Sequence, residues 1–207
     1  MKCPRHLRFL APILALYIPF LLQGCAAPVI AVGAGAMISQ DRRTTGTIID
    51  DNFIAHKILT SIADNERLRE RSHIGVASFN GIVLLTGEVL DPESRDRIED
   101  MARDVERVRG VHNEIVVDDL SGLGSRSKDA WLTTKVKTAL FKENFTGDDT
   151  IRPSQVKVVS ERGVIYLMGL LTQEEAEKAR EVARRQSGVR RVVELFESVK
   201  PADEDAG

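Results

Sequence analysis

One tryptophan stands on the polar side of a predicted helix, among residue types that suit an interfacial or anionic ligand. In residues 128–141, KDAWLTTKVKTALF, the apolar positions Leu132, Val136, Ala139 and Leu140 recur at helical spacing. At ~100° per residue, Trp131 points ~125° away from the centre of that apolar stripe. Two threonines and two lysines share its outward face. The candidate lipid-binding residues are therefore Trp131, Thr134, Lys135, Thr138 and Lys142.

This combination of side chains suits the boundary between water and a lipid bilayer. An indole ring buries apolar area while its N–H stays hydrated. Lysine stems lie along the acyl boundary and leave their ammonium groups at the phosphates. We expect lipid contact through this face. The alternative is that Trp131 packs against the first half of the chain or against the linker between the halves.

Residue types that serve catalysis or metal binding do not fall into a recognisable spacing. His56, His73 and His112 lie on three different predicted elements, so they do not have the local spacing of metal ligands. No GxGxxG or Walker pattern opens a helix, which argues against a phosphate loop. A Ser/His/Asp nucleophile would require tertiary convergence that spacing does not show. We therefore expect a binding protein that needs no cofactor or metal, not an enzyme.

The first 24 residues have the pattern of a secretory signal peptide. Lys2, Arg5 and Arg8 precede a mostly apolar run over residues 9–22. This run is shorter than the ~20 residues of a membrane-spanning helix, and its length suits a signal peptide. Pro12 and Pro19 argue against the alternative of a buried core helix.

The cysteine at the end of this run is a candidate for lipidation. The sequence LLQGC, with Gly24 before Cys25, resembles a bacterial lipobox, although Gln23 departs from the usual small or β-branched residue. The resemblance implies cleavage before Cys25, a diacylglycerol thioether and an N-acyl chain such as palmitate. Because Ala26 is not Asp, it also implies sorting to the outer membrane with the chain facing the periplasm. The alternative is an ordinary signal site cut elsewhere. With Cys3 removed and Cys25 acylated, no cysteine pair remains for a disulfide.

The remainder of the chain repeats itself, and the repeat supplies the elements that position Trp131. Each copy reads helix, strand, strand, helix, strand. The turn residues Asn80-Gly81 indicate a type I′ hairpin, and Arg162-Gly163 is its weaker counterpart. The last strand follows a helix, so we expect it to pair by a crossover. The matching segments are 51–62 with 129–140, 73–89 with 155–171, 93–105 with 174–186, and 111–117 with 192–198.

These patterns predict an α+β fold of two tandem αββαβ domains. In each domain two helices pack on one face of a three-stranded mixed sheet. Asp51 and Asp129 are expected to act as N-caps or first-turn acids of the first helices. The predicted segments are a signal peptide (1–24), a lipidated N-terminus and tether (25–49), domain 1 (50–118), a linker (119–127), domain 2 (128–199) and an acidic tail (200–207).

Charge is distributed unevenly between the two copies. Residues 50–119 contain 9 Lys and Arg against 16 Asp and Glu, a net charge of −7. Residues 126–200 contain 15 against 11, a net charge of +4. Anionic headgroups attract each basic residue near the surface by ~1 kcal/mol. The sequence therefore predicts that the second copy, not the first, approaches an anionic membrane.

The hairpin sequences GIVLLTG and GVIYLMG, each followed by a helix and a strand, resemble the BON domain. Two such domains behind a lipobox resemble dual BON-domain outer-membrane lipoproteins. The family has a glycine before the last strand; Gly188 supplies it in the second copy, but Arg107 falls there in the first. If that glycine caps the preceding helix with a positive φ, the first copy needs another cap, and we expect Gly110 to provide it.

The resemblance implies binding of anionic phospholipid, such as phosphatidylglycerol or cardiolipin, through the first helix of the second domain. It also implies gathering at the cell-division site and support of outer-membrane integrity and barrel-protein assembly. A second hypothesis is a protein-interaction adaptor whose Trp131 face binds an envelope partner such as the barrel-assembly machinery. Phe53, at the place of Trp131 in the acidic copy, is expected to pack at a domain interface. We expect no nucleic-acid partner.

Overall fold

The computed structural model describes residues 41–145 and 152–200. The predicted signal peptide, the candidate lipidation site Cys25, most of the predicted tether and residues 201–207 of the predicted acidic tail lie outside the described residues. All described residues belong to one of the two units into which the chain divides, Gln40–Gly207.

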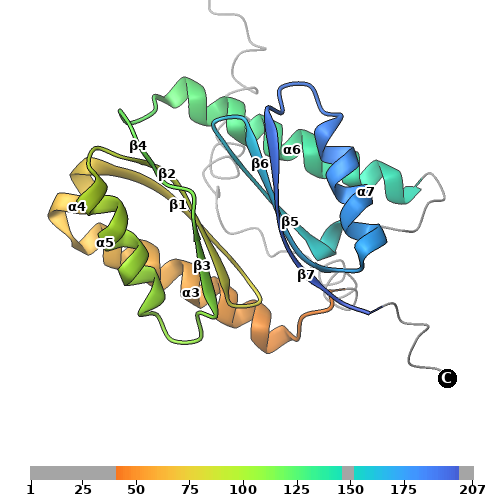
Figure 1. Ribbon diagram of the computed structural model, residues 1–207, viewed down its shortest axis with the longest axis horizontal. Coiled ribbons are helices and arrows are strands. Elements are labelled where there is room, and N and C mark those ends of the chain that lie inside the picture. The colour runs from red at the N-terminus through yellow and green to blue at the C-terminus, as the bar shows by residue number, and fades with distance from the viewer. Residues whose placement is uncertain (1–40, 146–151, 201–207) are drawn as a thin grey trace, which may run out of the picture. The chain divides into compact units, whose positions relative to one another are not determined.

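The first copy contains the elements that its sequence pattern predicts, with a short extra helix before the hairpin (Figure 1). Its helix α4 buries its one apolar residue, Leu68. The elements are α3 (Thr45–Asp64), α4 (Glu66–Arg71), β1 (Ser72–Phe79), β2 (Ile82–Val89), α5 (Pro92–Arg103), β3 (Gly110–Asn113) and β4 (Val116–Val117).

The second copy has the same order of elements, and a single 3₁₀ turn precedes its hairpin. Its second helix begins with a capping box, in which Thr172 and Glu175 each accept the backbone N–H of the other. The elements are α6 (Leu123–Phe145), η1 (Pro153–Gln155), β5 (Val156–Glu161), β6 (Val164–Leu171), α7 (Gln173–Arg184) and β7 (Arg191–Ser198).

Both sheets have the predicted mixed topology. In each copy the hairpin strands are antiparallel, and the last strand runs parallel to the second hairpin strand after a helical crossover. The hairpin turns have matching backbone angles: φ is 51° at Asn80 and Arg162 and 76° at Gly81 and Gly163. Two consecutive positive φ values are typical of a type I′ turn. The weaker Arg-Gly signal therefore specifies the same turn as Asn-Gly.

The sheet of the first copy has four strands because its last strand is interrupted. β3 pairs with Ile82–Leu85, and β4 pairs with Glu88 and Val89 farther along β2. Ile115, in the interruption between them, is buried in the domain core. In the second copy the matching strand, β7, is continuous over eight residues.

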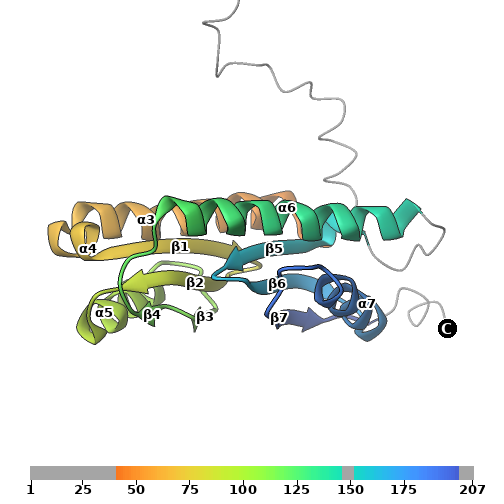
Figure 2. The ribbon, with the colours of Figure 1, turned by 90° about the horizontal axis from the view of Figure 1, so that it is seen from above.

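Each sheet carries its two helices on one face, as predicted. In both copies the first helix lies beside the first hairpin strand and the second helix lies toward the last strand (Figure 2). Alternate residues of the hairpin, such as Val83 and Leu85, point into a core formed with α3 and α5. Ile165 and Leu167 do the same with α6 and α7.

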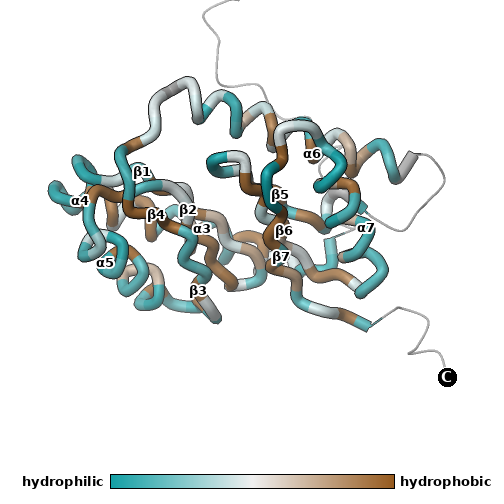
Figure 3. Tube along the Cα trace, turned by 45° about the horizontal axis from the view of Figure 1, so that its top comes forward, coloured by the Kyte–Doolittle hydropathy of each residue, from teal (hydrophilic) through white to brown (hydrophobic). Residues whose placement is uncertain are grey.

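The opposite faces of the two sheets form a third apolar cluster with each other. Leu84 and Phe79 from the first sheet pack with Tyr166 and Met168 from the second, and all four are buried. Hydrophobic residues therefore run along the strands of both sheets (Figure 3). Lys157 adds a polar contact by donating a hydrogen bond to the carbonyl of Ser78 at 3.0 Å. The two domains are thus docked through their sheets.

Two predicted boundaries differ from the structure. Helix α3 begins at Thr45, capped by the Thr44 hydroxyl, so the tether predicted for residues 25–49 ends earlier. Arg42 donates hydrogen bonds to Glu175 and to the carbonyl of Leu170, which ties this segment to the second domain. Helix α6 begins at Leu123, inside the linker predicted for residues 119–127.

The expected role of Gly110 as the alternative cap is wrong. Arg107 itself adopts φ +71°, at the place where Gly188 adopts φ +96° in the second copy. The first domain therefore keeps the same backbone turn, and the Arg107 side chain there requires a strained backbone conformation. Gly110 lies in β3, paired with Ile82.

Candidate functional site

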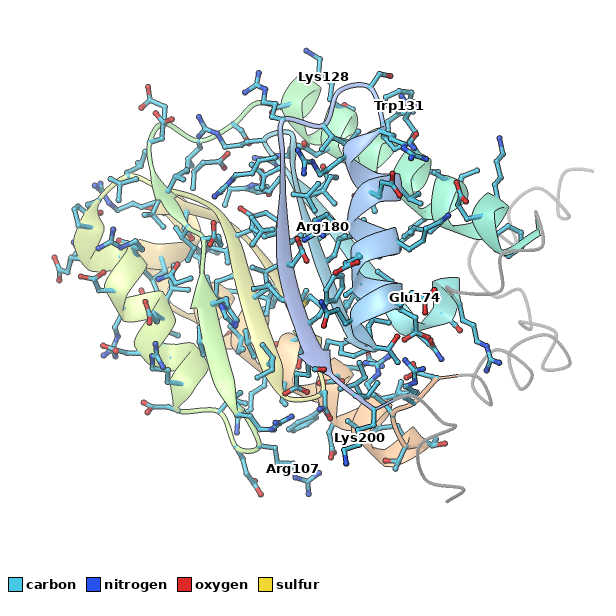
Figure 4. The ribbon with its side chains drawn as sticks, turned by 45° about the vertical axis from the view of Figure 1, so that its right-hand side comes forward. Arg107, Lys128, Trp131, Glu174, Arg180 and Lys200 are labelled. Carbon is cyan, nitrogen blue, oxygen red and sulfur yellow. The ribbon has the colours of Figure 1, made fainter. Side chains whose placement is uncertain are left out.

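The outer face of α6 presents Trp131 to solvent. Leu132, Val136 and Leu140 are buried against the second sheet, and this fixes the rotation of the helix. Trp131, one position before the stripe, is therefore turned outward and is 60% exposed. Figure 4 shows its side chain at the outer side of α6, near Lys128 and the end of α7. The expected outward direction of this indole agrees with the structure.

A buried carboxylate holds α6 against the hairpin of its own domain. The two oxygens of Asp129 accept the backbone N–H groups of Arg162 at 3.0 Å and of Gly163 at 2.9 Å. The hydroxyl of Ser160 donates a third hydrogen bond at 3.2 Å. The type I′ turn is thereby tied to the helix that carries Trp131.

Asp51 makes the same connection in the first domain. It accepts hydrogen bonds from the Ser78 hydroxyl at 2.6 Å and from the N–H groups of Asn80 and Gly81 at 2.7 and 2.8 Å. The prediction that Asp51 and Asp129 cap their helices is therefore wrong, because both helices begin six residues earlier. Their matching positions in the two copies of the repeat are explained by the hydrogen bonds that each makes to its hairpin turn.

Lys135 is anchored between the indole and a neighbouring loop. Its ammonium nitrogen lies 4.8 Å from the centre of the Trp131 ring, within the range of a cation–π contact. It also donates hydrogen bonds to the carbonyl of Ser187, at 3.0 Å, and to the Ser187 hydroxyl. Lys135 thus orients the ring and joins α6 to the loop between α7 and β7.

The other candidate residues lie on the same outer face. The hydroxyls of Thr134 and Thr138 donate to the carbonyls of Ala130 and Thr134, at 3.1 and 2.8 Å, so the helix itself satisfies them. Lys142 is exposed about two helical turns beyond Lys135. The structure thus places all five predicted residues on the outer face of α6, with Lys135 half-buried and the other four exposed.

Sequence reasoning missed further exposed residues of α6. Phe141 is 45% exposed and lies ~15 Å along the helix axis from Trp131, at 1.5 Å per residue. Its position next to the buried Leu140 hid it within the apolar pattern. Lys128 is exposed beside Trp131, whereas Arg126 and Lys137 are exposed on the other flank of α6, ~120–140° around the helix from Trp131 at ~100° per residue. Together they make the helix strongly basic. The available sequence signal for these basic residues was the concentration of Lys and Arg in this stretch of the chain.

Phe53 does not pack at a domain interface as expected. It is 62% exposed on α3, and Ile49, one turn earlier, is also 62% exposed. The prediction failed because the sheets, and not the first helices, form the contact between domains. Helix α3 carries Lys57 as its one basic residue, against three aspartates. The two helices thus present aromatic residues in opposite charge environments.

A buried polar group lies where the linker and both domains meet. The fully buried carboxylate of Glu88 lies 3.5 Å from Nδ1 of His73 and 3.7 Å from the Arg162 guanidinium. It accepts a hydrogen bond from the Ser121 hydroxyl at 3.2 Å. Burial, followed by the charges of Glu88 and Asp129, raises the pKa of Glu161 to about 7. The charge of Glu161 therefore changes with pH near neutrality.

The described residues contain neither a metal-binding cluster nor a membrane-spanning helix. Across 41–145 and 152–200, no group of three or more His, Cys, Asp or Glu side chains is arranged to hold a metal ion. His56, His73 and His112 lie on α3, β1 and β3. No helix within those same ranges has the length and apolar character needed to cross a bilayer.

Comparison with known proteins identifies the repeat. A family model described as BON domain matches residues 50–119 and 128–199. The chain is 38% identical over 176 residues to the outer membrane lipoprotein DolP of Haemophilus influenzae, covering 84% of this chain and 89% of that one. It is 31% identical to a 21 kDa hemolysin of Actinobacillus pleuropneumoniae (77% and 80% covered). It is 25% identical to the osmotically-inducible protein Y of Escherichia coli (77% and 78% covered).

Proposed function

Because the chain belongs to the BON-domain family and is a dual BON-domain protein like DolP, we propose that it binds anionic phospholipid through α6. It acts as a lipid-anchored, non-enzymatic protein of the cell envelope that supports outer-membrane integrity. Its ligands are phosphatidylglycerol and cardiolipin. The exposed indole of Trp131, on a helix face bordered by lysines, is the observation that carries this proposal.

The geometry of α6 favours a peripheral mode of binding. A ring that is 60% exposed can enter the headgroup region without any rearrangement of the core. Phe141 extends the apolar contact along the helix axis, while Lys142 and Lys137 reach the phosphates beside it. The helix would therefore lie in the plane of the membrane surface.

The charge of the two domains supports the use of the second domain. Residues 126–200 carry a net charge of +4 and residues 50–119 a net charge of −7. An anionic surface attracts the first set and repels the second within a Debye length of ~8 Å at physiological salt. Phe53 is as exposed as Trp131, but it stands on the acidic domain.

The lipid anchor at Cys25 would hold the protein on the periplasmic face of the outer membrane. Anchoring raises the effective concentration of α6 at the bilayer, so weak headgroup contacts suffice. A single acyl chain gives marginal binding, whereas the multiple chains of a lipobox cysteine give stable attachment. The relative named as an outer membrane lipoprotein supports this location.

Co-sedimentation with vesicles tests the proposal. The chain from residue 25 onward, with Cys25→Ser to remove acylation, should pellet with phosphatidylglycerol or cardiolipin vesicles and not with phosphatidylcholine vesicles. Trp131→Glu should abolish pelleting. Phe53→Glu is a matched control, because it makes the same change at the equivalent place of the first domain and should leave binding unchanged. Equal binding of both variants to phosphatidylglycerol vesicles would contradict the proposal.

A second candidate function is that of a protein-interaction adaptor. The exposed aromatic pair on α6 is also suited to a protein partner in the envelope, such as the barrel-assembly machinery. The same variants separate the two functions. If Trp131→Glu leaves vesicle binding intact but abolishes binding of a purified assembly complex in the absence of lipid, the adaptor function is supported.

A further inference from the structure

A hollow of about 520 Å³ opens beside Trp131, between the first turns of α6, the β5–β6 turn and the loop before β7. Its lining includes the cations Lys128, Arg162 and Arg190, and Gly188 forms part of its wall. Asp119 and Asp129 also border it, but Asp129 is engaged by the hairpin turn. A hollow of this size is in the range of small-molecule sites.

Two of these cations have no counterion among the described residues. Arg162 is paired with Asp118 at 2.7 Å. By contrast, neither Lys128 nor Arg190 makes an ion pair within residues 41–145 and 152–200. The backbone of Arg190 is fixed by a 2.8 Å hydrogen bond to the carbonyl of Gly163, and its stem lies across that glycine. A guanidinium is thus held at the hollow with its charge unpaired.

The matching positions of the first domain carry different side chains. Arg107 stands at the position of Gly188 and Asp50 at the position of Lys128. The two form an ion pair in the first domain. Arg109, the counterpart of Arg190, is paired with Glu197 at 2.9 Å. Both arginines at this turn of the first domain are therefore paired with acids, whereas the second domain has Gly188 and Lys128 at the positions of Arg107 and Asp50.

We propose that the hollow beside Trp131 binds the phosphodiester of a phospholipid headgroup, with Lys128 and Arg190 as its ligands. The proposal rests on the proposed function, since it names the headgroup site of the same membrane contact. A phosphodiester carries one negative charge and presents two free oxygens, which suits an ammonium and a guanidinium placed together. The neighbouring indole sets the depth at which the acyl chains begin.

The variant Gly188→Arg gives the most discriminating test. It restores the residue that the first domain carries at this turn and adds a positive charge. General attraction to an anionic surface therefore predicts tighter binding to phosphatidylglycerol vesicles, whereas filling of the hollow predicts weaker binding. We expect affinity to fall at least fivefold. Unchanged or tighter binding by the folded variant would overturn the proposal.

A second pair of variants avoids any change in the backbone at Gly188. Arg190→Gln should weaken binding to phosphatidylglycerol vesicles about fivefold or more, the effect of one basic residue close to the surface. Arg184→Gln removes the same charge from an exposed position on α7, outside the hollow, and should have a smaller effect. Equal effects of the two variants would show general electrostatics and contradict the site.

Soluble probes separate the headgroup from free phosphate. Dihexanoyl phosphatidylglycerol below its micelle concentration should shift the amide NMR signals of Gly163, Gly188 and Arg190, and inorganic phosphate at equal concentration should shift them less. Equal shifts would identify a free-anion site and overturn the headgroup assignment. If Trp131→Glu abolishes vesicle binding while Gly188→Arg and Arg190→Gln do not weaken it, the proposed function stands and this site fails.

Discussion

The carboxylate of Asp129 accepts the backbone N–H of Gly163 at 2.9 Å, so a helix residue is bonded directly to the tip of a hairpin. Asp51 and Gly81 repeat this relationship in the first domain at 2.8 Å. Together with the buried apolar stripe of the helix, this bond sets the rotation of the first helix and its position along the sheet. The outward direction of Trp131 depends on it.

Removal of this carboxylate should destabilise the protein. Asp129→Ala leaves two N–H groups of the turn without their acceptor, and we expect a loss of about 2–3 kcal/mol in the free energy of unfolding. Asp129→Asn should cost less, because one oxygen still accepts. Urea unfolding measures both. Asp64→Ala, at an exposed acid of α3, is the control; a similar loss for that variant would contradict the assigned role.

The raised pKa of Glu161 predicts a pH-dependent stability. Its folded-state pKa of about 7 lies above the ordinary value of 4.5, so the folded chain binds a proton that the unfolded chain releases in this window. Stability should therefore fall as pH rises from about 4.5 to about 7. Glu161→Gln should flatten this dependence and stabilise the protein at pH 8.

Urea midpoints between pH 5 and pH 8 provide the measurement for Glu161. Glu174→Gln is the control, because Glu174 is exposed on the first turn of α7. The raised pKa of Glu161 would be contradicted if the urea midpoints of the wild type and of Glu161→Gln changed equally with pH in this range.

The shared core of the two sheets predicts that the domains unfold together. Leu84 in the first domain is fully buried against Tyr166 and Met168 of the second. Leu84→Ala should cost about 2–4 kcal/mol. Because the one tryptophan of the chain lies in the second domain, its fluorescence should report this loss although the substitution is in the first.

Leu59→Ala is the control for that experiment, since Leu59 lies in the first domain but is 40% exposed. The Trp131 transition and the far-UV circular dichroism transition should remain coincident in both variants. Docking would be contradicted if Leu84→Ala lowered the dichroism midpoint and left the fluorescence midpoint in place.

Lys135 should act as a positioning residue for the indole and for the loop before β7. Lys135→Met keeps most of the stem but loses the bonds to Ser187 and the cation–π contact. We expect faster amide hydrogen exchange in residues 186–190 and an altered Trp131 emission. Exchange in residues 105–109, the matching loop of the first domain, should not change. Unaltered exchange in both loops would leave Lys135 as a simple surface charge.

Much of the fold was predictable from the repeat. Two copies of one pattern reveal turns that a single copy marks weakly, as Arg162-Gly163 shows beside Asn80-Gly81. The turn residues located the hairpins, and the helix between the last two strands required a parallel pairing. The direction of Trp131 followed from helical geometry alone.

The docking of the sheets was harder to predict, although a signal was present. The strands IVLL and VIYLM are apolar at successive positions, which indicates burial on both faces. That pattern does not specify which surface covers the second face of each sheet, because the residues of the other sheet that cover it are far away in the chain. Phe53 was placed wrongly for this reason. The aspartates were misassigned because a bond from a helix to a hairpin tip has no local spacing.

The hollow beside Trp131 was also beyond sequence reasoning. The exchange of Arg107 for Gly188 was visible as a departure between copies, but its consequence depends on Asp50 and Lys128, which are over 50 residues away. Because these positions come together in the fold, two separate sequence differences between the copies produce one open, basic site.

The fluorescence emission of Trp131 reports membrane entry of this ring without interference, because the sequence contains no other tryptophan. On addition of phosphatidylglycerol vesicles, we expect a shift of the emission to shorter wavelength and quenching by lipids brominated near the headgroup end of their acyl chains. Phosphatidylcholine vesicles should produce neither change. Emission that stays unshifted and unquenched while the protein pellets with phosphatidylglycerol vesicles would contradict the claim that this ring enters the membrane.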